Sequence, residues 1–300
     1  MPQAGTQQQQ GLKTMNETLK TPQTATPVSC DITSAIAARY GEAESNVPLA
    51  WNETIELLLS HRSVRGFLRD PLPNGTLEAL IAAAQSASSS SNVQAWTVIA
   101  VQNPETKAAL AKIAGNQKHI EECPLLLVWI ADLSRTEAMG RRHDYPTDAT
   151  AFLESFVVSV IDAALAAQNA TVALESFGLG MVYIGALRNN PEEVARILKL
   201  PPSAVAVFGM CVGYPDPARP YNVKPRLPQR VVLHREHYDQ SLPQEALDSY
   251  DTTLAAFQRR ENLTEVGWTK AMKSRWRDAK SINGRDRIRA ALIALGFKLS

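Results

Sequence analysis

Five consecutive residues, His61-Arg62-Ser63-Val64-Arg65, bring together two guanidinium groups, an imidazole and a hydroxyl. The arginine fork matches the oxygen geometry of a phosphate, so such a cluster at the end of a helix is suited to binding an anion. The same pattern also occurs as a solvated, charged turn. A second basic pair, Lys224 and Arg226, is held stiff by the prolines of Lys-Pro-Arg-Leu-Pro. The sequence therefore contains two candidate anion-binding segments.

A serine run ending in Asn92-Val93-Gln94 passes directly into the apolar stretch 97–101. Serine runs are usually flexible linkers. This one directly joins a helix and a strand that are both expected to be buried, so it is too short to be a flexible linker. Its hydroxyl and amide groups are therefore expected to form a fixed hydrogen-bonding surface.

Three glycines, Gly178, Gly180 and Gly185, surround Tyr183, and Arg188 follows them. Glycines leave the backbone bare, so its N–H groups can closely approach a flat ligand. A helix stop followed by a turn is the plainer interpretation of Gly178 and Gly180. A dinucleotide-binding fingerprint is disfavoured, because it needs a preceding strand, a following helix and a third glycine.

Machinery for hydrolysis or phosphoryl transfer is missing: no Ser/His/Asp or Cys/His arrangement, HExxH or phosphate-binding loop occurs. The three cysteines, Cys30, Cys123 and Cys211, lack metal-site spacing and fit reduced thiols in a cytosolic protein, the latter two as buried filler. The remaining features suit a phosphorylated, planar cofactor that supplies its own chemistry.

The overall charge gives no reason to expect nucleic acid or an anionic membrane as a partner, because the chain has 31 basic and 30 acidic residues. Residues 270–289 form a basic stretch that could contact nucleic acid. Aromatic residues other than Trp276 are absent from that stretch, which favours a solvated face.

Hydrophobic periodicity predicts the elements that position these groups. A long buried helix is expected over 151–177, with polar residues too frequent for a membrane span. Further helices are expected over 76–87, 104–114, 192–198 and 244–260, and strands over 97–101, 124–130, 181–184 and 204–212. Residues 134–148 look like a mobile polar loop. Residues 1–45 read as a disordered tail on composition, with structure beginning near Trp51.

Several of these segments, in this order and spacing, resemble the nitroreductase family of flavin oxidoreductases. The matching pieces are HRSVR at 61–65, the serine run, GNQKH at 115–119, AAQNA at 166–170, ESFGLGMVYIGALRNN at 175–190, FGMCVGYP at 208–215 and KPRLP at 224–228. They cover about residues 51–250.

The resemblance implies an α+β fold with a central, mainly antiparallel sheet, and an intertwined homodimer with two FMN sites at the subunit interface. Residues 46–300 would form the FMN-binding domain, the helix at 151–177 would mediate dimerisation, and residues 270–300 would pack on the partner subunit. The tail at 1–45 has no counterpart in the resemblance.

The resemblance also assigns roles by matching positions. The FMN phosphate end would be held by His61, Arg62, Ser63, Arg65, Lys224 and Arg226. The serine segment of the other subunit would contact the flavin through Ser88, Ser89, Ser90 and Asn92. Gln117 would meet the pyrimidine edge, and the backbone of Tyr183, Ile184, Gly185 and Ala186 would face N5 and O4. Acceptor-side contacts would come from Ser91, Arg188 and Arg285. Arg259 or Arg260 would read the 2′-phosphate of NADPH.

The expected function is a cytoplasmic, FMN-dependent NAD(P)H oxidoreductase, with NADPH favoured as donor and no catalytic side chain. Electrons would pass in a ping-pong cycle to nitroaromatics, quinones or similar electron-poor acceptors. Two alternatives stay open: a free-flavin reductase, and a non-catalytic protein that binds or stores flavin.

Overall fold

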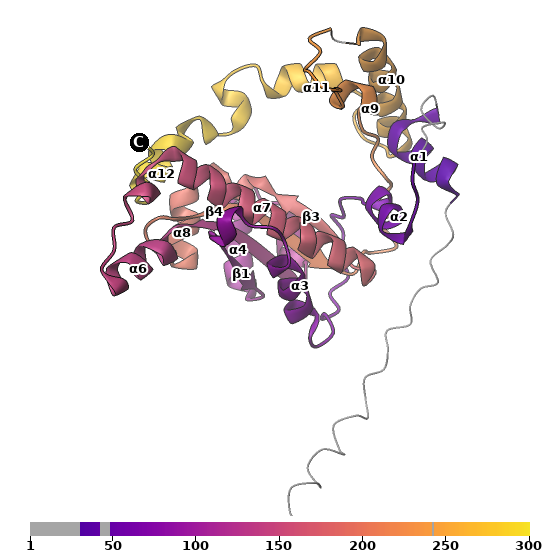
Figure 1. Cartoon of the computed structure of the whole chain (residues 1–300). Helices are drawn as coiled ribbons and strands as arrows, with labels where there is room; N and C mark the ends of the chain where they lie inside the picture. Colours follow the sequence, from indigo (N-terminus) through magenta and orange to yellow (C-terminus); the bar gives the residue numbers. More distant parts are fainter. Residues whose placement is uncertain (1–30, 43–48, 242) are drawn as a thin grey trace, which may run out of the picture. The chain divides into compact units, whose positions relative to one another are not determined.

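A computed structural model describes residues 31–42, 49–241 and 243–300 (Figure 1). Most of the predicted tail, residues 1–30 and 43–45, lies outside the described residues. The tail prediction is wrong for residues 32–40, which form helix α1 (Ile32–Tyr40). Its N-cap is Asp31, and it buries Ile36 and Arg39. The Gln-, Thr- and Pro-rich composition of the residues before it concealed this short helix.

The central sheet contains four strands: β1 (Trp96–Val101), β2 (Leu125–Asp132), β3 (Gly180–Ile184) and β4 (Ala204–Gly213). Their order is β1-β2-β4-β3, and all three pairings are antiparallel. Every residue of β2 is buried, as expected for a continuous apolar run at the centre of a sheet. The expected α+β class and antiparallel sheet are confirmed, and each predicted strand boundary lies within two residues of the observed one.

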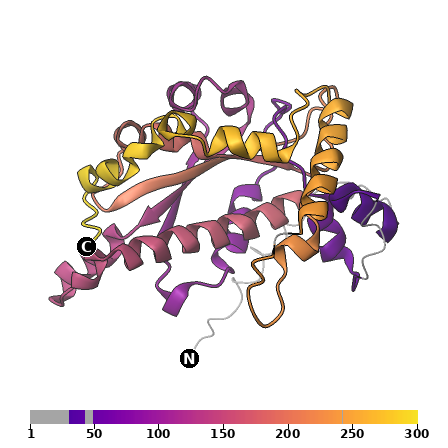
Figure 2. The same cartoon turned by 90° about the horizontal axis from the view of Figure 1, so that it is seen from above.

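Helix α7 (Leu153–Ser176) covers one face of the sheet together with α3 (Thr76–Gln85) (Figures 1 and 2). Its small side chains, Ala166, Ala167 and Ala170, pack among Leu127, Trp129 and Met210. Alanine lets a helix backbone approach a sheet closely, so this face forms a tight seam. In the described part of the chain, α7 alone has the length and composition of a membrane span; this alanine face is buried against the sheet.

The opposite face of the sheet is covered by α4 (Pro104–Ile113), α5 (Lys118–Glu122) and α8 (Pro191–Leu198), which pack Leu110, Ile120 and Val194 into a second core cluster. The remaining helices are α2 (Glu53–Ser60), α6 (Ser134–His143), α9 (Gln229–Val232), α10 (Gln244–Arg260), α11 (Trp268–Arg275) and α12 (Ile288–Ala294). Short 3₁₀ helices are η2 (Ser90–Asn92), η3 (Asp148–Ala151), η4 (Gly185–Asn189), η5 (Ala279–Ile282) and η6 (Arg285–Arg287).

The segment predicted as a mobile loop, 134–148, instead contains α6 and leads into η3. Asp132 starts the helix, since its carboxylate accepts hydrogen bonds from the backbone N–H and the hydroxyl of Ser134, at 3.0 and 2.6 Å. The loop prediction is therefore wrong. A helix that is polar nearly all round shows no apolar periodicity. Tertiary contacts hold it instead, since Arg135 donates to the Trp96 carbonyl at 2.9 Å and to Thr97 Oγ1 at 2.7 Å.

The end of the chain packs on the chain's own sheet. Leu292 and Phe297 are 5% and 3% exposed and lie among Leu133, Val205 and Val207. The Phe297 ring also meets Phe156 edge-on, with 5.3 Å between ring centroids. The resemblance implies that residues 270–300 pack on a partner subunit, but these last core contacts are made within one chain.

Replacing Phe297 by alanine should lower the free energy of unfolding by about 3–5 kcal/mol, because it leaves a cavity in this cluster. Ile293→Ala, at a side chain that is 51% exposed, is the control and should change it by about 0.5 kcal/mol or less. Urea unfolding followed by circular dichroism measures both. Equal effects of the two variants would contradict this packing.

Candidate functional site

A cavity of about 320 Å³ opens beside the end of β3. It is lined by Arg65, Gln117, His119, Val182, Tyr183, Ile184, Gly185, Ala186 and Arg285. All but Val182 and His119 are among the residues predicted for the site. The cavity therefore joins the basic pentapeptide, the GNQKH segment and the glycine segment, which are far apart in the sequence.

The floor of this cavity is backbone at the junction of β3 and η4. A Cβ atom on Gly185 would lie 3.3 Å from Arg188 Nη2, so the guanidinium lies close against this glycine. Arg188 is held there by donating a hydrogen bond to the Val207 carbonyl. Tyr183 is held by Thr171, with 2.9 Å between the hydroxyl oxygens, and by the Phe208 ring. Of the three glycines predicted to bare the backbone, Gly185 alone lines this cavity, whereas Gly178 and Gly180 line a separate pocket, in which Gly180 packs against Val64.

Arg65 and His119 line the cavity, and Lys224 and Arg226, outside its lining, lie close enough for Lys224 to interact electrostatically with Arg65 and Arg226. Burial, and then Arg65 and Arg226, lower the pKa of Lys224. Burial and then Arg65 likewise lower the pKa of His119. Within the described residues, Arg65, Lys224 and Arg226 form no ion pair, and the buried His119 Nε2 has no hydrogen-bond partner. An anion bound here would relieve the mutual repulsion of these groups.

A second cationic group consists of Arg188, Arg275 and Arg285. Burial, and then Arg188 and Arg275, lower the pKa of Arg285, and burial followed by Arg275 lowers that of Arg188. Arg285 donates to Asn189 Oδ1 at 2.9 Å, and Arg275 donates to the Ser281 carbonyl at 3.0 Å. In the described chain none of the three pairs with a carboxylate, so this side of the cavity is also positive.

The serine segment is a fixed loop, as predicted, but it does not line this cavity. The buried carboxylate of Asp162 on α7 accepts from Ser89 Oγ at 2.7 Å and from the backbone N–H groups of Ser90 and Ala95 at 3.2 and 3.0 Å. Positive φ angles at Ser91 and Asn92, 46° and 56°, shape the turn. Within one chain, Ser88 to Asn92 are therefore anchored to α7 and away from the cavity. Asp162 was missed as a functional residue because it stood out only as a polar residue in an apolar helix.

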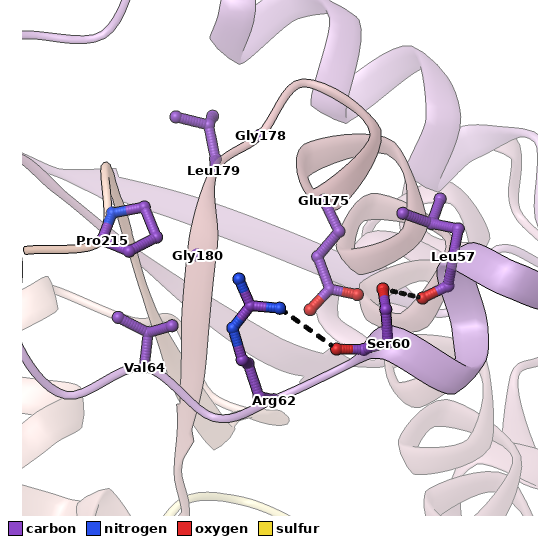
Figure 3. A pocket seen from close by; sticks show the side chains of 9 residues that line it. All are labelled: Leu57, Ser60, Arg62, Val64, Glu175, Gly178, Leu179, Gly180 and Pro215. Carbon is purple, nitrogen blue, oxygen red and sulfur yellow. Dashed lines mark hydrogen bonds between the residues drawn. The ribbon is translucent and has the colours of Figure 1, made fainter. Parts of the chain in front are cut away.

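The basic pentapeptide divides between two sites. Arg65 lines the cavity, whereas Arg62 extends with Glu175 into a separate small pocket that also contains Val64 and Gly180 (Figure 3). His61 Nδ1 lies 2.7 Å from Glu175 Oε1, and Ser63 forms a β-bridge with Met181. Successive side chains of an extended segment point in opposite directions, which separates Arg62 from Arg65.

Arg259 is not brought to the cavity. Its guanidinium forms a two-point ion pair with Glu265, at 2.9 and 2.6 Å. Cys123 and Cys211 are buried free thiols, as predicted. No cluster of His, Cys, Asp or Glu suited to a metal ion occurs among residues 31–42, 49–241 and 243–300.

Comparison with known proteins places two family models on the chain. The nitroreductase family matches residues 58–214, and the C-terminal domain of the same family matches residues 224–300. An FMN reductase (NADPH) of Bacillus subtilis is 39% identical over 211 residues, which cover 69% of this chain and 84% of the relative. An oxygen-insensitive NADPH nitroreductase of Salmonella typhimurium is 40% identical over 204 residues, 68% of this chain and 82% of the relative.

Solved structures agree with these matches. NfrA2 of B. megaterium has a TM-score of 0.78 and 36% identity, and the alignment covers 83% of this chain and 100% of that one. The NADPH:FMN oxidoreductase of Vibrio harveyi, complexed with NAD⁺, has a TM-score of 0.73 and 34% identity with the same coverage.

Replacing Asp162 by alanine should lower the free energy of unfolding by about 2 kcal/mol or more, because the buried Ala95 N–H loses its acceptor. Glu154→Ala removes an exposed carboxylate from the same helix and should cost less than about 1 kcal/mol. Chemical denaturation compares the two. An Asp162→Ala protein as stable as Glu154→Ala would show that the carboxylate does not anchor the loop.

Proposed function

The chain belongs to the nitroreductase family, and from that premise we propose that it is an FMN-dependent oxidoreductase that takes electrons from NAD(P)H. The observation that carries this proposal is the cavity at the β3–η4 junction, which residues 183–186 line together with Arg65 and Arg285, and neither arginine has an acidic partner in the described chain. Relatives that are 38–40% identical to this chain are named FMN reductases and an NADPH nitroreductase.

The donor set of the cavity fits a phosphorylated flavin. Arg65, Lys224 and Arg226 would hold the phosphate, with His61 and Ser63 shaping the segment that carries Arg65. Gln117 would meet the pyrimidine edge, and backbone N–H groups of Gly185 and Ala186 would face the ring. When bound, FMN supplies the redox chemistry, accepting a hydride from NAD(P)H and passing electrons to an acceptor. The fixed N–H donors and guanidinium groups favour a cofactor that gains negative charge on reduction, so no side-chain base is needed.

The proposed acceptors are nitroaromatics, quinones or similar electron-poor molecules, positioned by Arg188 and Arg285 and by Ser91 of a second subunit. NADPH is the favoured donor, because several relatives are named for it. Arg260 is a better candidate than Arg259 for binding the 2′-phosphate, because the Arg259 guanidinium already forms two hydrogen bonds with the Glu265 carboxylate. A free-flavin reductase is the second candidate, supported by the relatives named FMN reductase.

We further propose a cytoplasmic homodimer assembled through α7. The face of α7 that points away from the sheet exposes Leu153, Val157, Ile161 and Leu165, at 51%, 40%, 49% and 43%. These residues are four apart and form one apolar stripe along the helix. An exposed stripe of this kind is typical of a subunit interface. Dimerisation would also explain the serine loop, which Asp162 fixes to α7 away from its own cavity.

The purified protein should show flavin absorbance bands at roughly 370 and 450 nm. Under anaerobic conditions, NADPH should bleach the longer-wavelength band, and a quinone should restore it. Comparing turnover of a nitroaromatic with turnover of free FMN separates the two candidate enzymes. A protein that binds flavin but neither bleaches nor recovers is a binding protein, and a protein that binds no flavin refutes the proposal outright.

Sedimentation velocity should show a dimer for the native chain and a monomer for the double variant Ile161→Glu, Leu165→Glu, because two carboxylates would have to be buried in the interface. Ala108→Glu places one such carboxylate on an exposed position of α4, across the sheet, and should stay dimeric. A native monomer, or a dimer that survives the double substitution, would contradict the proposed role of α7.

A further inference from the structure

Helix α1 lies outside both family matches, which begin at residue 58 and end at residue 300 with a break between 214 and 224. It nevertheless contacts two segments that carry the cationic end of the cavity. The hydrogen bonds that join α1 to residues 59–61 and 224–226 are all made by one residue, Arg39.

The Arg39 guanidinium donates three hydrogen bonds to backbone carbonyls. Nη2 donates to Leu59 O at 2.6 Å and to His61 O at 2.8 Å, and Nη1 donates to Lys224 O at 3.0 Å. In return, the backbone N–H of Arg226 donates to Arg39 O at 2.7 Å. One residue therefore ties the start of the basic pentapeptide to the Lys-Pro-Arg segment, whose sequence positions differ by more than 160.

This arginine is unusual in its surroundings. It is only 6% exposed and pairs with no carboxylate in the described part of the chain. Burial and then Arg226 lower its pKa, which Tyr40 and Glu175 partly oppose. A buried charge of this kind contributes little to stability compared with an apolar side chain of similar volume. An apolar side chain cannot supply its hydrogen bonds to three carbonyls of two distant segments.

The helix that presents Arg39 is itself well seated. Ile36 is 2% exposed, and Tyr40 accepts a hydrogen bond from Gln229 Nε2 at 3.5 Å. Gly41 ends the helix at φ 91°, where a Cβ would lie 3.0 Å from the Thr253 side chain of α10. The close approach and the positive φ both favour glycine there. Arg39 is therefore presented from a fixed position.

We infer that Arg39 is a positioning residue for the phosphate end of the cofactor: α1 sets the spacing between the Arg65 segment and the Lys224–Arg226 segment, so that their cations converge on one anion. This inference rests on the proposed function. It assigns to a helix outside the family matches a part in the affinity for phosphorylated flavin.

The test measures dissociation constants of the full-length apoprotein for two probes, FMN and riboflavin, which differ only by the phosphate. In Arg39→Met, which keeps the side-chain bulk, the constant for FMN should rise about tenfold or more, and that for riboflavin should change far less. Arg39→Lys keeps the charge but cannot reach three carbonyls with one nitrogen, so it should show a smaller, equally selective loss. Ser34→Ala, on the exposed side of α1, should bind both probes like the native chain.

A loss shared equally by both probes, or no loss, would overturn the inference and leave only a structural role for Arg39. If Arg39→Met does not fold, the ratio of the two constants in Arg39→Lys decides. The dissociation constants of the native chain distinguish failure of this inference from failure of the proposed function. A native protein that binds neither probe defeats both. A native protein that binds FMN and riboflavin equally, or a strong native preference for FMN that survives in the Arg39 variants, defeats the inference alone.

Discussion

The structure depends on holding three exposed cations, Arg65, Lys224 and Arg226, near one another without an acidic partner in the described chain. Arg65, Lys224 and Arg226 come from distant segments, and burial and their neighbours lower the pKa of Lys224 and His119. Like charges held close together repel one another, and a bound anion would relieve that repulsion. The rest of the fold therefore has to hold like charges in place while leaving one side open to a ligand, and it does so with backbone contacts rather than with acidic partners.

The sheet and α7 supply the rigidity that this arrangement needs. The fully buried strand β2 and the alanine face of α7 form a core that keeps the end of β3 in place, and with it the bare backbone at Gly185. The same helix anchors the serine loop through Asp162 and exposes an apolar stripe on its outer side. One helix thus contributes to the core, to the loop proposed to contact the flavin and to the proposed subunit interface. A substitution in α7 is therefore expected to affect all three.

The sequence pattern was sufficient to predict an element where its periodicity of apolar residues matches the side chains that the fold buries. The apolar runs that form β2 and β4, the long helix α7 and the glycine-bared backbone around Tyr183 were all predicted, and the resemblance to the nitroreductase family is confirmed. Prediction was wrong for α1, which follows a long polar segment and was included with it, and for α6, whose polar sequence gives no apolar stripe. Distant contacts hold both helices, through Arg39 in α1 and Arg135 in α6. The separation of Arg62 from Arg65 was also missed, because it depends on which way an extended segment faces.

The most direct test of the central claim is a crystal structure of the protein with FMN. The account predicts the phosphate within hydrogen-bond distance of Arg65, Lys224 and Arg226, the ring against the backbone of Gly185 and Ala186, and the serine loop of a second subunit beside it. A phosphate bound instead at Arg62 in the small pocket, or at Arg188 and Arg285, would contradict the assignment of the cationic groups and with it the role inferred for α1.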